Sequence, residues 1–120
     1  MEHKVWYDDE LKVVRLDMVG IFSTEDARFM GKKFIELLEG KPYRQVVIDL
    51  KAFKNMENRE TRSVSSEVLN QAGITHVAAI GANATARMIA KILLKLGTMK
   101  SDLELFGTFE SGVKWIEKNR

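Results

Sequence analysis

The sequence predicts a single α/β domain with a mixed, mostly parallel five-stranded sheet and four helices, in the order β-β-α-β-α-β-α-β-α. The runs at 45–50 and 75–80 are rich in apolar, β-branched or small residues, as in strands that a parallel sheet buries on both faces. The segments beside them place apolar residues at three- and four-residue spacing, as in helices that cover a sheet. This alternation implies right-handed crossovers between neighbouring parallel strands.

The first half of the chain predicts a hairpin, a helix and a central strand. Two β-prone runs, 5–7 and 11–18, flank the cluster Asp8, Asp9 and Glu10, which we interpret as a solvated turn. A helix is expected over 24–38, because Ser23 can cap its start and Gly40 with Pro42 can end it. After the strand at 45–50, residues 51–58 are expected to form a polar loop.

The second half predicts three helices and two strands. A helix over 59–72 ends at Gly73, and a strand follows at 75–80. Asn83 can cap a third helix that ends at Gly97, and residues 103–106 form a last strand. The final helix begins at Thr108 or Glu110 and ends near Lys118. With no linker or repeat in between, we expect residues 1–120 to form one domain.

The composition excludes several classes of function. A formal charge of +2 is too small for nucleic-acid binding through a general field. The absence of cysteine excludes disulfides and thiolate sites. No signal-peptide stretch and no apolar run of membrane-spanning length occurs, so we expect a cytoplasmic protein, either a monomer or a homodimer.

No catalytic or metal-binding residue can be assigned from the sequence. The only histidines are His3, expected near a frayed terminus, and His76, at the start of a strand. A zinc site is therefore not expected, nor is a cofactor. Serines are plentiful, but no Gly-x-Ser-x-Gly elbow surrounds any of them. We expect a protein that is not an enzyme.

Two segments carry a family resemblance. The strand at 46–50 runs into a polar loop and a helix, and residues 106–116 (FGTFESGVKWI) place a phenylalanine, an acidic residue and an apolar-Trp-apolar helix after the last strand. With the element order, these features resemble the STAS, or SpoIIAA-like, domains of bacterial anti-sigma-factor antagonists. The resemblance covers nearly the whole chain and implies a regulatory domain that binds another protein.

In that family a serine at the start of the second helix is phosphorylated by the partner kinase. If Met56 and Glu57 align with the family's Met-Asp, the two serine positions hold Asn58 and Arg59, so the phosphoacceptor is missing. Thr61 or Ser63 could replace it only after a shift of register. We expect this segment to dock a protein without phosphorylation, through Asn55, Met56, Glu57, Asn58, Arg59 and Thr61.

The third helix supports an alternative of a different class. Residues 80–87 (IGANATAR) lie where a dinucleotide fingerprint belongs, but Asn83 and Ala86 replace two of its glycines. Arg87, Lys91 and Lys95 follow at four-residue spacing, and no acidic residue occurs between 82 and 101. With Leu94 and Met99 as additional exposed apolar area, the helix could bind a lipid, a small amphiphile or a nucleotide-like anion through Asn83, Arg87, Lys91 and Lys95. The six methionines of the chain would suit such a ligand, although core filling explains them equally well.

Overall fold

The structure is a computed structural model that describes residues 2–120; Met1, the first residue of the expected domain, lies outside the described residues. The nine elements follow the predicted order. They are β1 (Lys4–Asp8), β2 (Val13–Phe22), α1 (Thr24–Leu38), β3 (Gln45–Met56), α2 (Arg59–Gln71), β4 (His76–Ile80), α3 (Ala84–Leu96), β5 (Asp102–Phe106) and α4 (Phe109–Lys118).

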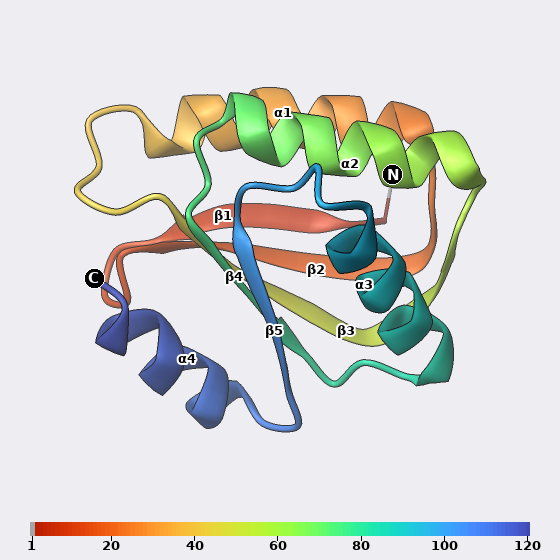
Figure 1. Cartoon of the computed structure of the whole chain (residues 1–120). Helices are drawn as coiled ribbons and strands as arrows, with labels where there is room; N and C mark the ends of the chain where they lie inside the picture. Colours follow the sequence, from red (N-terminus) through yellow and green to blue (C-terminus); the bar gives the residue numbers. More distant parts are fainter. Residues whose placement is uncertain (1) are drawn as a thin grey trace.

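The five strands form one sheet in the order β1-β2-β3-β4-β5. β1 pairs with β2 in antiparallel orientation, and the other neighbours are parallel. Figure 1 shows α1 and α2 side by side over one face and α4 on the opposite face. Buried residues of α1, α2 and α3 share one core with the sheet, while Ile116 of α4 packs into a second, smaller one. The predicted fold class is confirmed.

The helix starts follow local capping rules. Ser23 and Asp26 form a reciprocal capping box at the start of α1, and this helix has the predicted bounds. Asn58, Asn83 and Thr108 cap α2, α3 and α4 by accepting a backbone N–H three residues on. Because these caps depend on short-range contacts, the helix starts could be predicted from the sequence.

β3 is longer than predicted, and the expectation of a polar loop over 51–58 was wrong for residues 51–56. These residues continue β3 and pair with the end of β2. On its other side, β3 pairs with β4 only as far as Asp49. Two register shifts each give β3 one more residue than β2. Its inward side chains beyond Asp49 therefore recur every third residue, at Leu50, Phe53 and Met56. This spacing hides the alternation that marks a strand.

His3 does not lie in a frayed terminus, as its sequence position suggested. Its side chain is buried. Nδ1 accepts the Val19 N–H at 2.9 Å, where β2 leaves its regular pairing, and the ring packs edge-on against Phe22. The backbone irregularity in β2 thus leaves an N–H group that the imidazole satisfies, which holds the N-terminal residues in place.

Candidate functional site

The ends of β2 and β3 bring the starts of α1 and α2 together. Phe22 and Met56, the last residues of the two strands, are register partners. The Glu57 N–H donates to the Phe22 carbonyl at 2.9 Å, and the Glu57 carboxylate accepts the Thr24 N–H at 3.2 Å. Glu57 therefore satisfies a free amide of α1 and fixes the two helix starts relative to each other.

A small polar cluster lies between the two helices. Asn58 Oδ1 accepts the Thr61 N–H at 3.0 Å and the Thr61 hydroxyl at 3.1 Å. The Thr61 and Thr24 hydroxyls are 2.8 Å apart. Thr61 is fully buried. Of the predicted docking residues, Thr61 thus positions the start of α2 and does not present its side chain to a partner.

The other predicted docking residues form a continuous surface, which we call the β3–α2 surface: Asn55, Met56, Glu57, Asn58 and Arg59. Asn55, Glu57, Asn58 and Arg59 are exposed, whereas Met56 is half-buried. Ile21, the register partner of Asn55, is 54% exposed and adds an apolar side chain next to this surface.

The charges at the start of α2 are unevenly compensated. Glu60 pairs with Arg28 of α1 at 3.6 Å, with both side chains largely exposed. Arg59 has no ion-pair partner among residues 2–120. A cation at the first position of a helix also meets the positive end of the helix dipole. Stability of the isolated chain thus gives no reason for a positive charge at this position.

The second predicted set of residues lies on α3. Asn83 Oδ1 accepts the Ala86 N–H at 2.9 Å, and its amide donates to the Phe53 carbonyl of β3 at 3.0 Å. The Arg87 guanidinium folds back onto the Ala82 carbonyl at 3.2 Å. Lys91 and Lys95 are exposed, as is Leu94. The side chain of Asn83 is thus occupied by capping α3, and that of Arg87 by a backbone carbonyl. Of the four predicted residues, only Lys91 and Lys95 have side chains free to contact an anion in the described structure.

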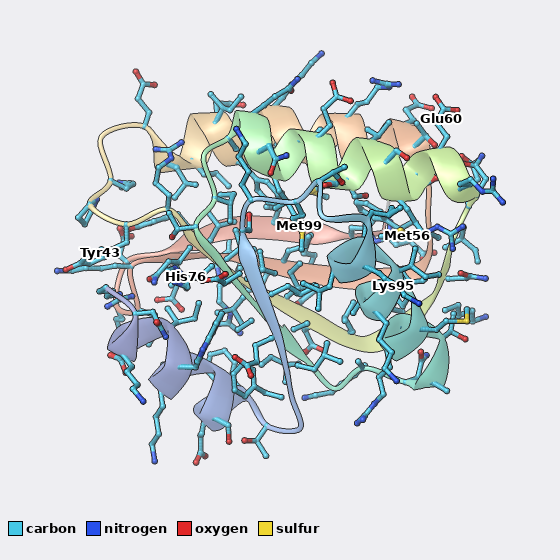
Figure 2. The ribbon with its side chains drawn as sticks, viewed as in Figure 1. Tyr43, Met56, Glu60, His76, Lys95 and Met99 are labelled. Carbon is cyan, nitrogen blue, oxygen red and sulfur yellow. The ribbon has the colours of Figure 1, made fainter. Side chains whose placement is uncertain are left out.

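An apolar cavity of about 80 Å³ lies between the three helices of this face and the sheet. Met99, which we expected on the exposed surface of the third helix, instead lines this cavity and is half-buried. In the view of Figure 2, Met56 and Met99 both lie below α2. The lining, apolar except for Ser65, comprises Leu16, Met18, Phe22, Ala27, Met30, Phe34, Ile48, Met56, Ser65, Val68, Leu69, Val77, Leu93, Met99 and Leu103.

This cavity was not predicted from the sequence, although the number of methionines was noted there. Part of the signal was present: Met18 and Met30 fall on apolar positions of predicted elements, whereas Met56 and Met99 were expected in exposed segments. Which of them face one another depends on how the helices cross the sheet, and spacing along the chain does not carry that information.

Two carboxyl groups among the described residues have pKa values below their ordinary range. Burial would raise the pKa of Asp26, but hydrogen bonds from Ser23 and His3 outweigh it and hold this pKa below its ordinary value. The Leu11 N–H is the main cause of the lowered pKa of Asp8, and Arg15 adds to it. Across residues 2–120, no three His, Cys, Asp or Glu side chains come together as metal ligands. In the same range no helix is long and apolar enough to cross a membrane.

The architecture is shared with several solved structures. The structure is similar to an uncharacterised protein of the DUF3478 family with a SpoIIAA-like fold from Shewanella loihica PV-4, with a TM-score of 0.69 and 14% identity over 94% of this chain and 92% of that one. A putative anti-sigma factor antagonist from Thermotoga maritima gives a TM-score of 0.65 and 14% identity, over 95% and 93% of the chains. The anti-sigma factor antagonist SpoIIAA in its unphosphorylated form gives 0.59 and 9%, over 96% and 97%. The fold is SpoIIAA-like.

The family follows from the sequence itself. Residues 5–120 match the model of a domain of unknown function, DUF7793, and the chain belongs to that family. A comparison with curated proteins gave no match.

Proposed function

We propose that this chain is a non-enzymatic, cytoplasmic regulatory domain that binds an acidic site on another protein through its β3–α2 surface, without being phosphorylated there. Two of the similar structures are described as anti-sigma factor antagonists, one of them putatively, which supports a regulatory role on this fold. Those two structures are at most 14% identical to this chain, so we infer the docking surface from the residues of the chain itself.

The observation that carries the proposal is the exposed cation of Arg59. It lies at the first position of α2, where the helix dipole disfavours it, and none of the ion pairs of the described chain includes it. A carboxylate or phosphate from a partner would compensate this charge. A charged guanidinium also offers two parallel donors, which suits a planar carboxylate.

The surroundings of Arg59 support a preorganised contact. Glu57 and Asn58 hold the helix starts through bonds of 3.2 Å or less. A partner would therefore meet a surface that loses little conformational freedom on binding, and affinity rises when that entropic cost is small. Ile21 adds an apolar contact beside this polar surface.

The test is charge reversal at this position. Arg59→Glu should weaken association with the native partner at least tenfold, a loss of about 1.4 kcal/mol. The melting temperature should change little, because Arg59 is exposed and makes no ion pair in the described structure. Lys32→Glu, which reverses an exposed charge on α1, is the matched control and should bind as the wild type does.

The measurement is a pull-down from the source cell, followed by calorimetry of the captured partner against wild type and both variants. Equal partner affinities for wild type and Arg59→Glu would overturn the proposal. So would stoichiometric phosphate on Thr61 or Ser63 in cell-derived protein, because the surface would then be a phosphorylation switch.

A further inference from the structure

α3 turns one face away from the protein. Its buried side chains, Ala86, Ile89, Ala90 and Leu93, face the interior. On an α-helix, positions three and four residues apart share one face. The exposed positions at this spacing form what we call the outer α3 face: Ala84, Arg87, Met88, Lys91, Leu94 and Lys95.

The outer α3 face carries charge of one sign. Arg87, Lys91 and Lys95 are its charged residues, and Lys100 follows the helix. Figure 2 labels Lys95 on α3. No acidic residue occurs between 82 and 101, and none of the four cations joins an ion pair within residues 2–120. Since the whole chain has a formal charge of only +2, this is a local excess of positive charge.

Apolar side chains lie among these cations. Met88 is 54% exposed and Leu94 52%, and Leu96 is exposed at the end of the helix. Among the described residues, three of the six exposed large hydrophobic side chains therefore belong to α3. Single exposed apolar residues are ordinary, but a group of them on one surface indicates a contact that removes them from water.

The combination selects one kind of contact. A second copy of this chain does not suit, because two-fold pairing of the outer α3 face would bring cations against cations. A small anion does not account for the exposed Met88 and Leu94. An anionic lipid surface offers negative headgroups to all the cations at once and an apolar layer just below them. Lysine stems are long enough to keep their charged ends at the headgroups while the neighbouring apolar side chains go deeper.

We propose that the outer α3 face binds the surface of an anionic membrane. Lys91 and Lys95 contact lipid phosphates, and Met88 and Leu94 enter the boundary between headgroups and acyl chains. Binding is peripheral, because the opposite face of α3 stays packed in the protein. The site shares no residue with the β3–α2 surface and goes beyond the protein-docking function proposed above.

The first experiment measures sedimentation of the full chain with vesicles at low ionic strength, where charges are least screened. The chain should bind vesicles of equal parts phosphatidylglycerol and phosphatidylcholine, and not vesicles of phosphatidylcholine alone. Lys91→Glu with Lys95→Glu should weaken binding at least tenfold, because both charges then repel the lipid. Lys114→Glu with Lys118→Glu reverses two exposed charges at the same spacing on α4 and should bind as wild type does.

A second pair of variants tests the apolar part of the contact. Met88→Gln with Leu94→Gln keeps every charge, so its binding should be weaker than that of wild type and should be lost at lower salt. Phe29→Gln with Ile35→Gln removes two exposed apolar side chains from α1 and is the control, which should bind normally. All the replaced side chains are exposed, so the melting temperatures should stay close to that of wild type.

A fluorescent label tests which face meets the lipid. The chain has no cysteine, so Met88→Cys and Lys114→Cys each accept one environment-sensitive nitrobenzoxadiazole group. The emission at position 88 should shift to the blue when phosphatidylglycerol vesicles are added, because the label enters an apolar layer. The emission at position 114, on α4, should not change.

Three results would overturn the proposal. The first is the absence of binding to phosphatidylglycerol vesicles at low salt. The second is an equal loss of binding in the α3 and α4 lysine variants, or equal blue shifts at positions 88 and 114, which would indicate non-specific attraction. The third is loss of the cellular protein partner in Lys91→Glu with Lys95→Glu when wild type binds no vesicles, which would make the outer α3 face part of a protein interface.

Discussion

His3 Nε2 donates to Asp26 Oδ2 at 3.1 Å, and this bond ties the start of β1 to the first turn of α1. The tautomer follows from the partners, because Nδ1 accepts the Val19 N–H and must carry no proton. The same Asp26 oxygen accepts the Ser23 N–H of the capping box at 3.0 Å. One carboxylate oxygen therefore stabilises both the helix start and the N-terminal residues.

Asp26→Asn should destabilise the protein by about 1–2 kcal/mol at pH 7, since a charged acceptor of two hydrogen bonds is replaced by a neutral one. The folded pKa of Asp26 is lowered, so its stabilising contribution is complete above the unfolded pKa and is lost as the pH falls through the folded one. Wild type should lose more stability between about pH 5 and pH 2.5 than Asp26→Asn does. Urea unfolding across this range is the measurement. Asp9→Asn, at an exposed turn position, is the control and should follow wild type.

The cap of α2 should be separable from the proposed docking function. Asn58→Ala removes the acceptor for the Thr61 N–H and should cost about 1 kcal/mol of stability. Arg59→Glu should cost nothing measurable, because the new negative charge suits the helix N-terminus. Thermal and urea unfolding of the two variants provide the comparison. A larger loss in Arg59→Glu than in Asn58→Ala would contradict a surface role for Arg59.

Gly112 lets α4 pack closely on the sheet. A Cβ at this position would clash with Ile80 Cδ1, while its next contacts, at 3.5 Å, are ordinary ones. Gly112→Ala should therefore destabilise the protein by about 1–3 kcal/mol, although alanine favours a helix. Ile80→Val removes the clashing methyl group, so the double variant should lose less stability than the sum of the single ones. Additive losses in urea unfolding would mean that another contact limits the approach.

Gln45 anchors the end of α4 from inside the protein. Its carboxamide donates to the Ile116 carbonyl at 3.0 Å, its oxygen accepts from Arg120 at 3.1 Å, and the side chain is 1% exposed. Gln45→Ala should cost about 2–4 kcal/mol, because it leaves a cavity and an unpaired carbonyl. Hydrogen exchange should show the loss mainly in α4. Uniform loss of protection across α1 to α3 would argue against an anchoring role.

The structure shows which of the predicted docking residues have exposed side chains. Glu57, Asn58 and Arg59 are exposed, as polar residues after a strand usually are, and Asn55 is exposed within β3. Thr61 has the same sequence character, yet it is buried by Thr24 of another helix. Spacing along one helix does not reveal which hydroxyl a neighbouring helix will cover. Whether these residues dock a partner remains a prediction.

The sequence alone determined the order of the elements, the helix starts and the class of fold, because these depend on apolar periodicity and caps within a few residues of one another. Only the tertiary structure decided the length of β3, the place of His3 and the apolar cavity between the helices and the sheet. The extension of β3 depends on pairing with β2 through two register shifts, and His3 depends on an N–H group left free in a distant strand. The cavity depends on how α1, α2 and α3 pack on the sheet, because its lining brings together residues that are far apart in the chain.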